Sequence, residues 1–264
     1  MLRNLSRASL VLGILPVTTA FAQDSILLRL KPKVGSVYVY QATQEVSMSG
    51  IGEPRSETSK STLTINVLSS NSRAVKLQSS VSNIASPSKS ASEVNGLKVT
   101  MTLSPLYKVL SASSSGGGKT GALMAKGMES AMRMTPQYPS KRLRVGDSWP
   151  IAIDLKNMLE AMGSGQFSFV GGSTINMRVS IARIERRNKD TFAHLKMTGS
   201  GRLSMEANKQ RVPIEFSMNS TLLVDVATGM HYSMDMVVNE KIKVPTGTVV
   251  IKIRSETKLT KRTN

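Results

Sequence analysis

The sequence predicts a mainly β protein: a curved antiparallel sheet or half-barrel that is built from two related halves and covered by two short Met-rich helices. Three observations favour this fold class. Apolar and polar residues alternate along many segments, which is typical of strands with one buried and one solvated face. A turn motif occurs twice along the chain. Two further segments show the periodicity of amphipathic helices instead.

Residues 1–22 have the features of a secretory signal peptide. Arg3 and Arg7 form a positive region, an apolar stretch follows, and Ala20 and Ala22 give the small-residue cleavage pattern. The apolar stretch is shorter than the ~20 residues that a membrane-spanning helix needs. The chain contains no cysteine, which excludes a lipid anchor on a terminal Cys. We therefore expect an exported, soluble protein, periplasmic or secreted, that begins after Ala22 and is not lipid-anchored.

A repeated motif marks the start of each predicted half. Residues 31–38 (KPKVGSVY) and 142–149 (RLRVGDSW) share two basic residues, a Val, a Gly and an aromatic residue at matching positions. The glycine supplies backbone freedom for a turn, and the aromatic residue begins a strand. The structural turn residues are therefore predicted to be Gly35, Gly146, Asp147 and Trp149. We expect the indole of Trp149 to be buried against the sheet.

The domain organisation follows from this motif. The expected units are a first β half (residues 23–110), a connecting segment with an amphipathic helix (111–141) and a second β half (142–264). The clearest strand pattern spans residues 212–226, where a shift of one residue would turn the whole apolar face into water. The same alternation occurs at 63–67, 75–81, 97–103, 175–181, 193–197, 230–236 and 249–253. One wet and one dry face predict antiparallel strands in a meander.

Residues 119–134 and 154–162 are predicted to form the two helices. Six of the sixteen methionines lie between residues 124 and 162. Methionine fills irregular gaps in a core, and it also lines adaptable binding grooves. Two alternatives therefore stay open: the helices complete the core, or they form a lid over an apolar ligand. On the second, the candidate ligand-binding residues are Met124, Met128, Met132, Met158 and Met162, with Lys126 and Arg133 at a positive rim.

The formal net charge of +18 is concentrated in two runs. Residues 178–189 carry five basic side chains and residues 241–264 carry seven. A basic surface attracts anions, but export and an aromatic content of 4% argue against nucleic acid, whose bases stack on aromatic side chains. Two alternatives stay open for the basic runs. They bind an anionic envelope surface, or they form a well-solvated face with no dedicated partner. Nothing in the sequence indicates the oligomeric state.

Two sequences that resemble catalytic motifs do not fit their families. Gly146-Asp147-Ser148 resembles the nucleophile block of a hydrolase family, but it lies mid-chain and no Asp-x-x-His follows. Ser113 stands where a phosphate-binding loop ending in Gly118-Lys119-Thr120 needs glycine. The two histidines, His194 and His231, are expected on the solvated faces of their strands, and without cysteine they make a poor metal site. The sequence therefore predicts no enzyme, no cofactor and no metal.

Around QYPSKRLRVGDSWPI the chain resembles a group of secreted bacterial β proteins with a Val-Gly-Asp-x-Trp turn after a helix and a Lys-x-Gly-x-x-Tyr strand near the mature start. The matching residues are Pro139, Val145, Gly146, Asp147 and Trp149, with Lys33, Gly35 and Tyr38. Leu143-Arg144 departs from the pattern before the turn. The group has no assigned activity, so the resemblance implies export and a β fold. The expected architecture is also similar, at the level of fold alone, to periplasmic lipid and lipoprotein carriers.

Two classes of function follow. The first is a binding module that holds a lipid or other apolar or amphipathic ligand between sheet and helices. The second is a cell-envelope interaction or structural protein that acts through its strongly basic surface.

Overall fold

One antiparallel sheet contains every strand that the structure describes. The structure is a computed structural model, and it describes residues 25–50, 52–85, 96–115, 135–154, 167–169, 174–207 and 210–263, with residues 129 and 132. Its strands are β1 (Val37–Ser49), β2 (Arg55–Ser70), β3 (Val75–Ala85), β4 (Lys98–Leu103), β5 (Val109–Ser115), β6 (Ser148–Asp154), β7 (Phe167–Phe169), β8 (Thr174–Arg187), β9 (Asp190–Ala207), β10 (Gln210–Asp225), β11 (His231–Val244) and β12 (Gly247–Thr263).

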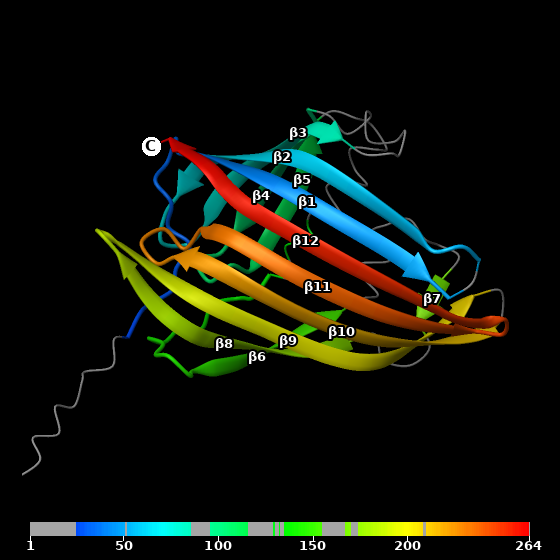
Figure 1. The fold of residues 1–264 in the computed structure, drawn as a ribbon. Helices are drawn as coiled ribbons and strands as arrows, with labels where there is room; N and C mark the ends of the chain where they lie inside the picture. Colours follow the sequence, from blue (N-terminus) through cyan, green and yellow to red (C-terminus); the bar gives the residue numbers. More distant parts are fainter. Residues whose placement is uncertain are drawn as a thin grey trace, which may run out of the picture.

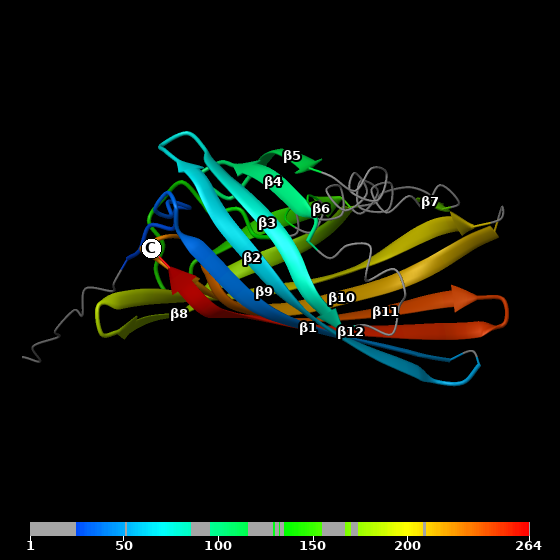
Figure 2. The ribbon, with the colours of Figure 1, turned by 90° about the horizontal axis from the view of Figure 1, so that it is seen from above.

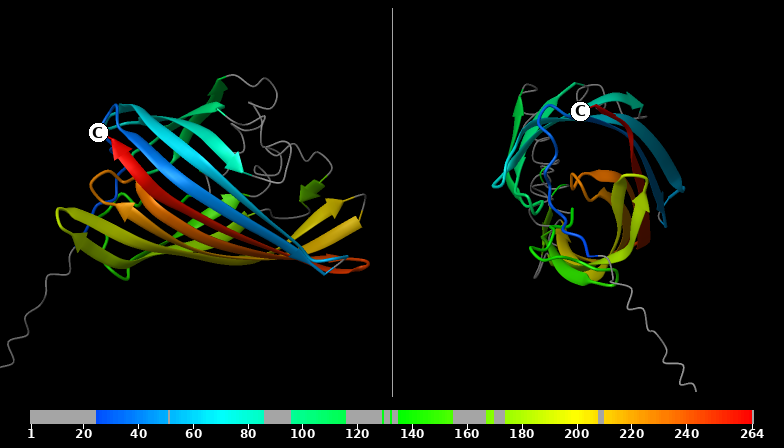
Figure 3. Two further views of the ribbon diagram at one scale, coloured as in Figure 1. Left: turned by 45° about the horizontal axis from the view of Figure 1, so that its top comes forward. Right: turned by 90° about the vertical axis from the view of Figure 1, so that its left-hand side faces the viewer.

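The strand order is β5-β4-β3-β2-β1-β12-β11-β10-β9-β8-β6, with the short β7 paired to β9. Strand β1 joins the two parts of the sheet because it pairs with both β2 and β12. Within the described strands, the edge strands β5 and β6 do not pair, so the sheet curves without closing (Figures 1 and 3). Figure 2 shows that β9–β12 run the length of the molecule, whereas β3–β5 cover one part of it. The predicted antiparallel, mainly β fold is confirmed.

Alternation of side chains decides which face of this sheet is the core. In β10, Val212, Ile214, Phe216 and Met218 are all less than a tenth exposed, and the residues between them are not buried. Their neighbours in register on β9, Leu203 among them, point to the same concave face. The pattern that predicted this strand is therefore the pattern that buries it, because alternate side chains point to opposite faces of a strand.

Residues 25–36, which we call the crossing segment, run across one end of the curved sheet (Figure 3, right). Ile26 exchanges backbone hydrogen bonds of 2.8 and 2.7 Å with Leu143, and the amide of Leu30 donates to the carbonyl of Pro105 at 2.8 Å. The segment then packs against the turn after β10. A Cβ on Gly229, whose φ is +69°, would lie 2.1 Å from the carbonyl oxygen of Arg29. Glycine at 229 therefore permits the contact that closes this end.

The two copies of the repeated motif form turns with the same hydrogen bonds. In the first, Gly35 N donates to Val67 O (2.9 Å), Ser36 N to Lys33 O (3.2 Å), and Val67 N to Ser36 O (3.0 Å). In the second, the matching bonds are Gly146 N to Ile181 O (2.9 Å), Asp147 N to Arg144 O (3.1 Å), and Ile181 N to Asp147 O (2.9 Å). Both glycines have positive φ, +84° and +89°. The turns predicted at Gly35 and Gly146 are present.

Trp149 does not have the burial that we predicted for it. Its side chain is half-buried rather than enclosed, and its Nε1–H donates to the carbonyl of Gln137 at 2.9 Å. The reason is its place in the sheet: Trp149 lies on β6, an edge strand that pairs only with β8 among the described strands. One side of the indole therefore has no neighbouring strand to cover it.

The two predicted Met-rich helices are not supported. Most of residues 119–134 and 154–162 lies outside the described residues, as do residues 1–22. Of these ranges, Glu129 and Met132 have helical backbone, and Asp154 is the last residue of β6. Strand β5 continues to Ser115, inside the range assigned to the connecting segment, because its backbone pairs with β4. In the described part of the chain, no helix is long and apolar enough to cross a membrane.

Candidate functional site

An apolar cavity of about 240 Å³ lies on the concave face near the crossing segment. Its wall is formed mainly by Leu63 and Ile65 of β2, Leu77 of β3, Met101 of β4 and Met234 of β11. These side chains share one face because their strands pair in register, as Leu63 does with Val81 and Leu77 with Met101. The cavity is therefore a consequence of the alternation that builds the core, at a place where side chains do not fill the space.

An aromatic cluster closes one side of the cavity. The ring of His231 stacks on Tyr107, with centroids 5.0 Å apart and planes 6° apart, and Tyr107 meets Tyr138 edge to face at 5.3 Å. Tyr40 Oη donates to His231 O and Tyr138 Oη donates to Gly229 O, both at 2.9 Å. Burial raises the pKa of each of these three tyrosines. Each ring is thus fixed by a hydrogen bond or a stacking contact.

His231 lies on the concave face, so the solvated position predicted for it is wrong. A bulge in the pairing of β10 with β11 places Val224 opposite His231, whereas Leu223 pairs with Ser233. The extra residue turns both His231 and Met234 inward, which simple alternation would not allow. Burial lowers the pKa of His231 to about 4, so its imidazole is neutral at pH 7. His194 does lie on the outer face as predicted, with Nε2 2.7 Å from Glu185.

Two polar atoms at the cavity are buried without a hydrogen-bond partner among the described residues. They are Ser79 Oγ and His231 Nε2. Leaving a buried donor or acceptor unpaired costs about 1–3 kcal/mol. Buried polar groups in folded proteins are nearly always paired, so these two atoms set Ser79 and His231 apart from the apolar side chains of the wall.

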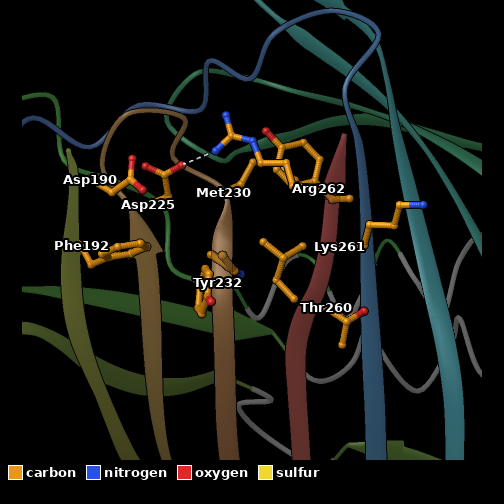
Figure 4. Close-up of a pocket in the computed structure, with 11 residues that line it drawn as sticks. Asp190, Phe192, Asp225, Met230, Tyr232, Thr260, Lys261 and Arg262 are labelled. Atoms are coloured by element: carbon orange, nitrogen blue, oxygen red, sulfur yellow. Dashed lines mark hydrogen bonds and ion pairs between the residues drawn. The ribbon is translucent and has the colours of Figure 1, made fainter. Parts of the chain in front are cut away.

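A second cavity, of about 250 Å³ and polar, adjoins the first. It lies where β11 and β12 separate, because their pairing begins only at Ser233 and Lys258. Arg262 reaches across the gap to Asp225, with Nη1 and Oδ2 3.1 Å apart, while Lys261 points the other way (Figure 4). His231, together with Met230, lines both cavities, so these two side chains form the shared wall.

Met132 is the predicted ligand-binding residue that the structure places at the cavity, where it lines the wall and packs against the core. The others lie outside the described residues: Met124, Lys126, Met128, Arg133, Met158 and Met162. Ser79, Tyr107 and His231 were not predicted. Ser79 carries a signal, since it continues the inward series of Val75 and Leu77. His231 carries no such sequence signal, because a bulge in the pairing of β10 with β11 does not alter the alternation of apolar and polar residues.

The two basic runs lie on different strands and do not meet in the sheet. Residues 178–187 belong to β8, whereas residues 241–244 belong to β11 and residues 247–263 to β12, so β9 and β10 lie between the two runs. In the first run, Arg187 and Arg183 form ion pairs with Glu185, and hydrogen bonds from Arg187 and His194 lower the pKa of Glu185 to about 2. Part of that basic charge is therefore already balanced.

Ser148, the serine of the Gly-Asp-Ser sequence, begins the edge strand β6. Ser148 Oγ accepts a hydrogen bond from Arg178 Nη1 at 2.8 Å and is exposed. Across the described part of the chain, no three His, Asp or Glu side chains are placed to hold a metal ion.

Comparison with known proteins relates the chain to others by fold. No protein-family model matches the sequence, and a search of curated proteins finds no match. A chain of lipovitellin, from a structure concerned with lipid–protein interactions, superposes with a TM-score of 0.53 at 10% identity, covering 88% of this chain and 26% of that one. The present chain thus spans about a quarter of the lipovitellin chain that it matches. This likeness establishes a shared fold.

Two further solved structures have lower scores. An exported protein with a YmcC-like fold from Bacteroides fragilis matches with a TM-score of 0.28 at 10% identity, covering 90% of this chain and all of that one (100%). The attachment invasion locus protein Ail of Yersinia pestis, in complex with a heparin analogue, matches with a TM-score of 0.19 at 6% identity, covering 88% of this chain and 100% of that one. Scores in this range do not establish a shared fold.

Proposed function

We propose that the protein binds an apolar or amphipathic ligand in the cavity on the concave face of its sheet. The observation that carries the proposal is the apolar cavity of about 240 Å³. A dry cavity of about 150 Å³ with aliphatic and aromatic walls is large enough to bind benzene. The wall here is of that kind, because Leu, Ile and Met side chains form most of it.

The likeness to lipovitellin supports this proposal at the level of fold. The lipovitellin structure concerns lipid–protein interactions, and its match covers 88% of this chain. Fold alone does not fix function, so the proposal rests on the cavity. The proposed role is binding rather than catalysis: His231 is stacked and neutral, and its neighbours at the cavity are hydrocarbons and hydroxyls. Export to the cell envelope is part of the proposal, because residues 1–22 predict a signal peptide.

The test is binding of the neutral fluorescent probe N-phenyl-1-naphthylamine to the full chain, and to the Met132→Gln variant. Met132 lines the cavity, so a polar side chain there should weaken binding about fivefold, which corresponds to about 1 kcal/mol. Met236→Gln is the matched control, since Met236 is also partly buried against the core but does not line the cavity. Absence of probe binding, or equal effects of the two variants, would refute the proposal.

A second candidate function uses the outer face. Lys252, Arg254 and Lys258 of β12 are exposed on the side of the sheet opposite the cavity. These side chains favour contact with an anionic envelope surface. Such contact weakens as salt screens charges over about 10 Å at 0.1 M. Binding to anionic vesicles that disappears in salt and is unaffected by Met132→Gln would favour this second function over the cavity.

A further inference from the structure

The two unpaired polar atoms at the apolar cavity differ from the other buried polar atoms of the described residues. Ser79 is 1% exposed and lines the cavity, and its Oγ is buried without a hydrogen-bond partner among the described residues. His231 also lines it, and its Nε2 is buried and likewise unpaired among the described residues. Ser220 has a similarly buried and unpaired Oγ on the same concave face, but it does not line the cavity. A ligand in the cavity could therefore provide partners for Ser79 and His231, and not for Ser220.

Neither of these atoms can easily turn to another partner. Ser79 lies within the sheet, in register with Ile65 of β2 on one side and Val99 of β4 on the other. Its hydroxyl therefore stays on the concave face. The ring of His231 is stacked on Tyr107, and its backbone carbonyl accepts the hydroxyl of Tyr40. The structure thus presents one hydroxyl and one ring nitrogen at fixed places beside an apolar wall.

The cavity wall carries no charged side chain among the described residues. His231 is neutral at pH 7, because burial lowers its pKa to about 4. An anionic group placed here would lose its hydration without gaining a counter-charge, which is strongly unfavourable. A hydroxyl group is better matched, because it can both donate and accept, as can a serine hydroxyl and a neutral imidazole between them.

We infer that the ligand is an amphiphile whose polar end is an uncharged hydroxyl group, bound by Ser79 and His231. Its hydrocarbon chain lies along Leu63, Ile65 and Met101. This inference rests on the proposed function, because it names the ligand class of the same cavity. It differs from the positive rim of Lys126 and Arg133 that the sequence predicted around the ligand.

The adjoining polar cavity defines the competing arrangement. It shares Met230 and His231 with the apolar cavity and contains Lys261 and Arg262. An anionic amphiphile would place its head group there, beside Arg262, with its chain passing His231. Arg262 already forms an ion pair with Asp225. The two arrangements make opposite predictions for the charge of the ligand.

The first experiment compares competitors of equal chain length. Dodecan-1-ol, dodecanoate and dodecyl phosphate, each below its micellar concentration at pH 8, compete with N-phenyl-1-naphthylamine bound to the full chain. The alcohol should displace the probe at a concentration at least about tenfold lower than either anion, since only it gains the two hydrogen bonds without burying a charge. Equal or stronger displacement by an anion overturns the inference. Displacement by an anion that is lost in Arg262→Gln assigns the polar end to the polar cavity.

The second experiment uses variants of the two polar groups. Relative to the affinity for the probe, which carries no hydroxyl group, Ser79→Ala and His231→Phe should each lower the affinity for dodecan-1-ol about 3- to 10-fold. Phenylalanine keeps the ring that stacks on Tyr107. Ser220→Ala is the matched control and should leave both affinities unchanged. If the alcohol binds equally to all variants, the inference is wrong although the proposed function stands. If the probe itself does not bind, both fail. If His231→Phe does not fold, Ser79→Ala and the competitor series still test the inference.

Discussion

The turns at Gly35 and Gly146 have the same three backbone hydrogen bonds, but their side chains lie in different surroundings. After the first turn, Tyr38 is 1% exposed, and the guanidinium of Arg262 lies 5.6 Å from its ring centroid. After the second turn, Trp149 is half-buried. The position before each glycine is a valine, and both valines are exposed, Val34 at 53% and Val145 at 40%.

The difference between the turns follows from their places in the sheet. Tyr38 begins β1, which has β2 on one side and β12 on the other. Trp149 begins β6, an edge strand of the described sheet. The glycine and its spacing to the next aromatic residue thus determine the backbone, and the neighbouring strands determine burial. The relation between the two halves as wholes stays a prediction, whereas the turns agree bond for bond.

The largest expected effect on the free energy of unfolding comes from replacing the aromatic residue that follows each turn. Tyr38→Ala should lower the free energy of unfolding by about 3–5 kcal/mol, because it removes a fully enclosed ring. Trp149→Ala should cost about half as much, roughly 2 kcal/mol, although tryptophan is larger, because part of the indole is already in solvent. Urea denaturation followed by circular dichroism measures both. Equal losses would show that the surroundings of the two turns do not differ in the way described.

The fold class could be predicted because alternation is a local property. Residues such as Val212, Ile214 and Phe216 show their inward face in the sequence itself, and the structure buries them. The burial of Trp149 could not be predicted in this way. It depends on whether a strand has one neighbour or two: among the described strands β6 pairs only with β8, whereas β1 pairs with β2 and also with β12, more than 200 positions away in the sequence.

The cavity was harder to predict than the sheet for the same reason. The methionine content predicted candidate ligand-binding residues between residues 124 and 162. Of these, the structure places Met132 at the cavity. Its polar groups come from β3 and β11, which are far apart in the chain. His231 faces inward only because of a bulge. A bulge depends on how two strands pair, so no pattern within either strand reveals it.

A smaller effect tests whether the glycines of the two turns are equivalent. Gly35→Ala and Gly146→Ala should each cost about 1–2 kcal/mol, because both residues have positive φ, which a Cβ disfavours. The two losses should agree closely, since no atom lies within 4 Å of a Cβ built at either position. Thermal unfolding of the two variants measures this. A loss confined to one glycine would mean that the turns share hydrogen bonds but not backbone strain.

The smallest effect concerns the residue after each glycine, where the two turns use different side chains. Asp147 Oδ2 accepts the amide of Arg144 at 2.9 Å, so Asp147→Ala removes a hydrogen bond and should cost about 1 kcal/mol. Ser36 is fully buried, and its Oγ makes no hydrogen bond to the backbone of its turn that matches the Asp147 bond, so Ser36→Ala should cost less than Asp147→Ala. Asp147→Asn is the control, because its amide oxygen can accept the same hydrogen bond without the charge. Urea denaturation of the three variants measures these losses. A loss of stability in Asp147→Ala that is absent in Asp147→Asn assigns the effect to the hydrogen bond. A loss in Ser36→Ala as large as that in Asp147→Ala would show that the serine hydroxyl supports the first turn as the carboxylate supports the second.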